Sequence, residues 1–224
     1  MKILLIETAT RVCSAAMAVD GTVTIRECCD ADAHSTRLPL FLKELTDAAR
    51  PDAVCVSSGP GSYTGLRIGV SSAKGLCYGY GIPLLSVPTL LSMAALYYAQ
   101  HPGYKGLVCP MIDARRMECY TMMVDPQLNV LRDTQADVIT EGFYDEWLDR
   151  GDVTFIGDGA AKTRPLLASH TNARYDDDFT VSATGMLQLA EQRLAAGKVE
   201  DVAYFEPFYL KDFVAKKSVV HGLR

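Results

Sequence analysis

A glycine-rich segment in the first third of the chain has residue types that could bind an anion. It follows a short apolar run, Ala53 to Ser57, that is typical of a buried strand, and it opens a helical pattern. Backbone amides and the dipole at the start of a helix favour negative charge there. The segment consists of Gly59, Pro60, Gly61, Ser62, Tyr63, Thr64, Gly65, Leu66, Arg67, Ile68 and Gly69.

This segment matches neither standard nucleotide loop. A Walker A loop needs Lys after its last glycine, where this chain has Leu66, and a dinucleotide fingerprint needs glycine where Thr64 stands. The other interpretation is a rigid strand-to-helix turn, in which glycines adopt positive φ and Ser62 or Thr64 caps the helix. The residues alone favour the rigid turn over a phosphate cradle.

Charged residues alternate through a second candidate segment, a predicted hairpin tip with Asp113, Arg115, Arg116 and Glu118. Alternate residues of β structure share a side, so some of these side chains project together. Two interpretations stand level. The tip is either a solvated turn whose ion pairs contribute little, or a contact surface for another molecule.

Metal and nucleophile chemistry have little support in the sequence. The four histidines, His34, His101, His170 and His221, are too far apart for a helical ligand pair. His34 stands near a predicted helix start, where a polar residue is ordinary. No Gly-x-Ser-x-Gly elbow occurs. We therefore expect no metal site and no catalytic residue.

Composition indicates a globular protein that does not grip nucleic acid by itself. Hydrophobic residues make up 49% of the 224 residues, and the net charge is -5, whereas neutralising phosphates needs clustered Lys and Arg. The apolar run Ile3 to Ile6 is too short for a signal peptide, and no stretch approaches a membrane span. The seven cysteines contain no Cys-x-x-Cys pair, which favours buried free thiols. We expect a cytoplasmic protein without membrane contact.

The elements that position the candidate residues follow a repeated order of β-meander, helix, strand and helix. Strands are predicted at 2–7, 12–19, 22–28, 53–57, 84–87, 107–112, 117–124, 128–131 and 153–156. Helices are predicted at 34–49, 66–80, 89–100, 143–148, 160–168 and 183–196. The repetition predicts two related α/β lobes, residues 1–104 and 105–224, with a C-terminal tail that packs back on the first lobe.

The spelling of several segments resembles the TsaB (YeaZ) family. Segment 59–69 matches the family hallmark almost letter for letter, and five further markers follow in the family's order. They are Ile6 to Thr10 with Cys13-Ser14, His34 to Pro39, Asp113 to Tyr120, Gly157 to Gly159, and Pro207 to Lys211. Glu7, Cys119 and Lys211 replace the usual Asp, Val and Arg.

The resemblance implies an actin-like (ASKHA, ribonuclease H-like) α/β fold and a non-catalytic dimerisation subunit. Such a subunit binds and supports its catalytic paralogue, TsaD, in forming threonylcarbamoyladenosine at position 37 of tRNAs that read codons starting with A. The ATPase TsaE belongs to the same assembly, and tRNA is reached only through the complex. The isolated chain is expected to hold no cofactor, with ATP or ADP as an option at the interface of the complex.

Two alternatives stay open. One is an enzyme, either metallo-glycopeptidase-like (M22) or a small-molecule kinase of the same fold, and the other is a homodimer that binds a nucleotide between its subunits. In the first turn, Ala9 stands where related kinases have the glycine of a phosphate turn. A side chain there hinders close approach of a phosphate to the backbone, so nucleotide binding by this chain alone is the weaker interpretation.

The resemblance also implies a partner-binding surface, a bundle of the 66–80 and 34–49 helices with their counterparts in TsaD. Gly69 and Ala73 align with Leu76 on one helical face that would admit another helix, or would instead pack on strand 53–57. The predicted partner-binding residues are Gly59, Pro60, Gly61, Ser62, Tyr63, Thr64, Gly65, Arg67, Gly69, Ala73, Leu76, His34, Asp113 and Arg115.

Overall fold

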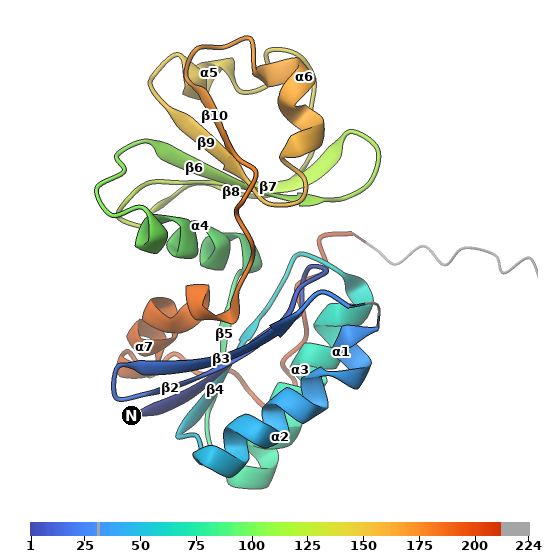
Figure 1. The fold of residues 1–224 in the computed structure, drawn as a ribbon, viewed down its shortest axis with the longest axis vertical. Coiled ribbons are helices and arrows are strands. Elements are labelled where there is room, and N and C mark those ends of the chain that lie inside the picture. Colours follow the sequence, from blue (N-terminus) through green and yellow to red (C-terminus); the bar gives the residue numbers. More distant parts are fainter. Residues whose placement is uncertain (31, 212–224) are drawn as a thin grey trace, which may run out of the picture.

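The computed structural model describes residues 1–30 and 32–211, which form two five-stranded sheets (Figure 1). The first sheet has the order β3-β2-β1-β4-β5 and the second has the order β10-β9-β6-β7-β8. The strands of the first sheet are β1 Lys2–Glu7, β2 Cys13–Val19, β3 Thr22–Cys28, β4 Ala53–Ser57 and β5 Leu84–Val87. Those of the second are β6 Leu107–Asp113, β7 Glu118–Val124, β8 Val130–Val138, β9 Val153–Ile156 and β10 Ala173–Asp176.

The two sheets repeat one topology. When the second is read from β8 to β10, each of its strands takes the place of the strand five earlier in the chain. In both sheets the first strand lies at the centre, antiparallel to the second strand and parallel to the fourth. This repetition is the two-lobed α/β architecture that the sequence predicts.

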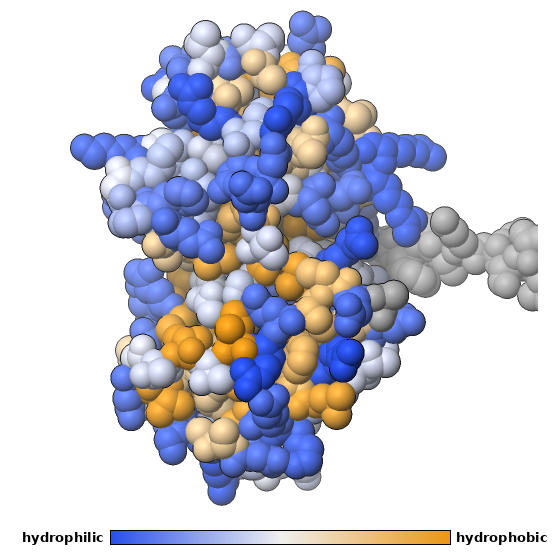
Figure 2. Space-filling model, viewed as in Figure 1, coloured by the Kyte–Doolittle hydropathy of each residue, from blue (hydrophilic) through white to orange (hydrophobic). Residues whose placement is uncertain are grey.

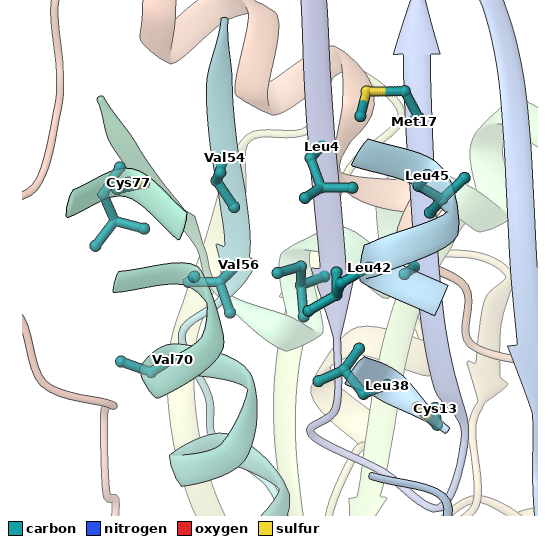
Figure 3. Close-up of a cluster of buried hydrophobic side chains, with 14 of the residues drawn as sticks. Leu4, Cys13, Met17, Leu38, Leu42, Leu45, Val54, Val56, Val70 and Cys77 are labelled. Atoms are coloured by element: carbon teal, nitrogen blue, oxygen red, sulfur yellow. The ribbon is translucent and has the colours of Figure 1, made fainter. Parts of the chain in front are cut away.

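Helices α1 Ala33–Thr36, α2 Leu38–Ala48 and α3 Tyr63–Tyr80 cover one face of the first sheet (Figure 1). The helical spacing of Leu38, Leu42 and Leu45 turns one stripe of α2 towards the strands, where all three are buried. Figure 3 shows these leucines against Leu4 of β1. Burial of this stripe fixes both the helices and the turns at their ends.

Helix α4 Thr89–Gln100 lies between the lobes (Figure 1). Its Ala95 packs with the first sheet, whereas Met93 and Tyr97 pack with the second. The far face of the second sheet is covered by α5 Asp145–Leu148, the short helix η1 Ala161–Thr163 and α6 Arg164–Leu167. A helix that is apolar on two sides therefore joins the two cores.

After β10 the chain returns to the first lobe. The short helix η2 Ala183–Met186 and α7 Leu187–Ala195 cover the second face of the first sheet. Further on, Glu200 N donates to Leu84 O at 2.8 Å, and Phe208 N donates to Ser58 O at 2.7 Å. The predicted boundary at residues 104 and 105 falls between α4 and β6, but residues 183–208 contact the first lobe.

Most predicted elements are present, with instructive differences. The 34–49 helix is divided into α1 and α2, and Pro39, which has no N–H to donate, lies in the first turn of α2. Helix α3 begins at Tyr63 rather than Leu66 because Ser62 caps it. Strand β8 extends to Val138, well beyond the predicted 128–131. The sequence prediction omits strand β10, whose alternating Ala-Arg-Tyr-Asp spans only four residues and is too short to stand out as a strand.

Candidate functional site between the lobes

A cleft of about 1100 Å³ lies where the two lobes meet. Its first wall is the β1–β2 turn with the glycine-rich loop, and its second wall is the β6–β7 hairpin with Asp158. Residues 208–211 of the C-terminal segment close a third side. The cleft is therefore built from segments that the sequence marks separately.

On the first-lobe wall, the glycine-rich loop packs directly on the β1–β2 turn. Ser62 N donates to Ala9 O at 2.6 Å. A Cβ atom on Gly61 would lie 2.2 Å from Ala9 O, and one on Gly65 would lie 2.0 Å from Thr8 O. Ser62 Oγ accepts from Gly65 N at 3.2 Å, which caps α3. These glycines bring the helix start against the turn. The Ser62 cap agrees with the rigid-turn interpretation, but of the glycines in segment 59–69 only Gly59 has the positive φ that it expected.

Glu7, at the end of β1, is fully buried beneath this turn. Its Oε1 accepts hydrogen bonds from Ala9 N at 2.6 Å and from Ser57 Oγ at 3.0 Å. Desolvation by burial raises the pKa of Glu7 to about 7, against these stabilising hydrogen bonds. The carboxyl group is thus part of the interior, and its Oε2 is buried without a hydrogen-bond partner among the described residues.

On the second-lobe wall, Asp113 occupies the matching end of β6. Its N donates to Asp158 Oδ1 at 2.9 Å, and its own Oδ1 accepts from Arg115 N at 2.8 Å and forms an ion pair with Lys162. Partial burial raises the pKa of Asp113, but the hydrogen bonds from Lys162 and Arg115 outweigh it and hold the pKa below its ordinary value. Arg115 and Arg116 form the tip with φ of 73° and 51°.

Asp158 joins the hairpin to the turn after β9. Burial raises the pKa of Asp158, and the hydrogen bond from Asp113 N opposes that shift. Gly157 has φ of 94°, and a Cβ atom there would lie 2.5 Å from Met111 O. In the second lobe, the glycine turn after β9 thus lies close to β6, just as the glycine-rich loop lies close to the β1–β2 turn in the first lobe. Asp158 lines the cleft.

The C-terminal segment adds residues that the predicted site omits. The ring of Tyr209 lies 4.9 Å from that of Tyr63, and Arg67 Nε donates to Tyr209 Oη at 3.3 Å. Lys211 forms an ion pair with Glu118 of β7, so this segment contacts both lobes. The sequence marks 207–211 as a family-like motif, but no local pattern places it in the cleft.

The structure brings several predicted site residues together. Those that line the cleft are His34, Pro60, Gly61, Ser62, Tyr63, Thr64, Asp113 and Arg115. His34 Nε2 contacts Val12 O at 3.3 Å and so ties α1 to the start of β2. Gly59 and Gly65 are buried below the loop, while Arg67 is exposed beside it.

The structure corrects the expectation for Gly69 and Ala73. Both are buried, and a Cβ atom on Gly69 would lie 2.2 Å from Thr8 Oγ1. Their face of α3 packs against the first sheet, so the internal-packing alternative holds and this face is closed to a partner helix. The turn between β1 and β2 explains this packing, because Thr8 lies directly against α3 at both Gly65 and Gly69.

The opposite side of α3 is open. A Cβ atom on Gly75 or Gly79 would meet nothing within 4 Å, and the side chain of Tyr78 is 85% exposed. Ile68 of α3 and Phe41 of α2 are only partly buried, whereas Leu76 is partly buried on the inward face with Gly69. We call the set formed by Phe41, Ile68, Gly75, Tyr78 and Gly79 the α2–α3 surface. In Figure 2, apolar surface is more extensive on the lower lobe, which is the first, than on the upper one.

Two further observations limit the chemistry of the described residues. Within residues 1–30 and 32–211, no group of three or more His, Cys, Asp or Glu side chains is placed to hold a metal ion. In the same part of the chain, no helix has the length and apolar character to span a bilayer.

Fold and cleft together define an actin-like α/β protein of two related lobes. The family model described as "TsaD: tRNA N6-adenosine threonylcarbamoyltransferase" matches residues 29–219. The TsaB protein of Escherichia coli, a tRNA threonylcarbamoyladenosine biosynthesis protein, is 32% identical, with 98% of both chains covered. The structure of YeaZ from Pseudomonas aeruginosa is 26% identical with a TM-score of 0.79, covering 93% of this chain and 99% of that one.

The chain therefore belongs to the TsaB family, whose role lies in tRNA threonylcarbamoyladenosine biosynthesis. A tRNA N6-adenosine threonylcarbamoyltransferase of Thermosipho africanus is also similar, at 29% identity over 49% of this chain and 35% of that protein. The chain is thus related to both a biosynthesis protein and a transferase of one modification.

Proposed function

We propose that this chain is a non-catalytic subunit that binds TsaD and supports it in forming threonylcarbamoyladenosine at position 37 of tRNAs that read codons starting with A. The observation that carries the proposal is the filled first-lobe turn. Gly61 and Gly65 pack on the backbone of Ala9 and Thr8, and Glu7 is buried. The backbone that would have to approach a phosphate is already occupied by the chain's own loop.

The α2–α3 surface supports the binding half of the proposal. Open glycines on α3 let another helix approach closely, and the partly buried Phe41 and Ile68 offer apolar area. Two helices of TsaD laid against α2 and α3 would form a bundle and cover these side chains. The corrected interface thus uses the outward side of α3, with Gly75 in place of Gly69.

The remaining parts of the assembly follow from this role. TsaE is the proposed ATPase of the complex, and tRNA is contacted through the complex, since a net charge of -5 gives this chain no surplus of cations. The proposal assigns no cofactor to the chain alone and leaves ATP or ADP to the interface with the catalytic subunit. The site of action is the cytoplasm.

Calorimetric titration of the chain with TsaD from the same organism tests the interface. Gly75→Trp should weaken binding about five- to hundredfold, because overpacking a tight interface costs about 1 to 3 kcal/mol. Its melting temperature should not fall, since the position is open. The control Glu191→Trp, at an exposed position of α7 on the other face of the sheet, should bind like the wild type. Equal binding by all three proteins, or a homodimer that excludes TsaD, would refute the assignment.

A further inference from the structure

Two cysteines face each other at the end of the β2–β3 ladder. Cys13 begins β2, Cys28 ends β3, and the register pairs them directly. Opposite residues of an antiparallel pair have Cα atoms about 4.5 to 5.5 Å apart. Disulfides span Cα separations of roughly 4.4 to 6.8 Å. The backbone therefore already holds the two residues at a separation that a disulfide accepts.

The two side chains lie on the same face of the sheet. Cys13 is fully buried in the cluster beneath α2, and Figure 3 shows it beside Leu38. Cys28 is half-buried and packs against that same cluster. Burial, together with the charge and hydrogen bond of the neighbouring Cys28 thiol, raises the pKa of Cys13 to about 12. The sulfur atoms are therefore close enough to influence each other.

Accessibility separates the roles of the thiols. Cys13 is closed to solvent, whereas Cys28 is partly open and Cys29 is exposed. An external oxidant can reach Cys28 but not Cys13. The Cβ atoms of opposite residues must move slightly closer to reach the distance of a disulfide. Because the pair stands at the end of the ladder, the strands can adjust by this small amount.

We propose that Cys13 and Cys28 form a reversible disulfide site, which a low-molecular-weight disulfide of the glutathione type closes and a thiol reductant opens. The Cys28 thiolate attacks one sulfur of the small disulfide, forms a mixed disulfide and releases one small thiolate. The Cys13 sulfur then attacks the Cys28 sulfur as its proton passes to the departing sulfur of the small molecule, which leaves as the second small thiol. Two protein thiols are oxidised, and one small disulfide is reduced to two thiols.

The site lies next to the start of the helical layer. His34 of α1 contacts Val12 O, one residue before Cys13. A bond between β2 and β3 at this point ties together the two strand ends that support α1. Backbone hydrogen exchange over residues 12–14 and 33–37 should therefore slow on oxidation, while exchange in β6 and β9 of the second lobe stays the same.

The test uses the reduced full chain incubated with oxidised glutathione, followed by alkylation, intact-mass measurement and peptide mapping. Wild type and the control Cys29→Ser should each lose two hydrogens and two alkylatable thiols, with Cys13 linked to Cys28. Dithiothreitol should restore both thiols. Cys28→Ser should form no such link, and its melting temperature should match that of the reduced wild type because the position is only half-buried.

Three outcomes would overturn the proposal. They are a Cys28–Cys29 link, glutathione adducts without an internal bond, and full retention of thiols in wild type. If Cys28→Ser melts at a lower temperature, Cys28→Ala replaces it, and survival of the two-hydrogen loss in that variant would also contradict the assignment.

Discussion

The turns that follow β1 and β6 hold matching places in the two lobes but differ in environment. The first carries Glu7 with no exposed surface and is covered by the glycine-rich loop. The second carries Asp113 and Arg115 at an exposed, charged tip. One topology thus supplies a structural turn in one lobe and an accessible one in the other. We therefore expect stability to depend on the first turn and partner contacts on the second.

The largest effect should come from filling the space between α3 and the first turn. Gly65→Ala places a Cβ atom 2.0 Å from Thr8 O, a backbone atom that cannot rotate away. We expect the free energy of unfolding, measured in urea, to fall by about 3 kcal/mol.

The matched control for Gly65→Ala is Gly75→Ala in the same helix. Its new methyl group meets nothing within 4 Å, so the better helix propensity of alanine should stabilise the protein by up to about 1 kcal/mol. Similar changes in both variants would mean that the glycine loop is not packed as described.

The buried carboxyl of Glu7 should make stability depend on pH. Its folded-state pKa of about 7 exceeds the ordinary 4.5, so the folded protein holds this proton more tightly. The stabilisation is complete below pH 4.5 and is lost as pH rises through 7, with a total of about 3 kcal/mol. Glu7→Gln keeps the acceptor oxygen and removes the charge.

Urea unfolding between pH 4.5 and 8 checks this expectation. The Glu7→Gln curve should lie above that of the wild type at pH 8 and converge with it near pH 4.5. Parallel curves over this range would show that Glu7 stays ionised and solvated.

Substitutions in the second turn should be much milder for folding. Arg115→Ala should change the free energy of unfolding by less than about 0.5 kcal/mol, because the side chain is exposed. Asp113→Ala loses the hydrogen bond from Arg115 N and should cost about 1 kcal/mol.

Both variants should instead weaken assembly with TsaD, by about tenfold in the dissociation constant. Calorimetry provides the affinity and thermal melts provide the stability. Wild-type affinity in both would favour the solvated-turn interpretation of the hairpin, and a collapse of the melt would make the tip structural.

The sequence predicts the central strands β1, β4, β6 and β9 well because each is a short apolar run bounded by turn residues. The positions of Gly69 and Gly75 alone do not show which face of α3 packs on the sheet, because both are small residues in the same helix. Only the position of Thr8 shows that Gly69 faces inward. The contacts of Tyr209 and Lys211 join residues far apart in the chain, so no local pattern could place them.

The proposed roles, catalysis by TsaD and support by this chain, are tested most directly by a threonylcarbamoyl transfer assay on tRNA. The assay supplies threonylcarbamoyl adenylate and compares this chain alone, TsaD from the same organism alone, and the two together with TsaE and ATP. We expect no modified adenosine from this chain alone, and product that rises with this chain only when TsaD is present. Formation of threonylcarbamoyladenosine by this chain alone, or a yield from TsaD that does not depend on it, would contradict the account.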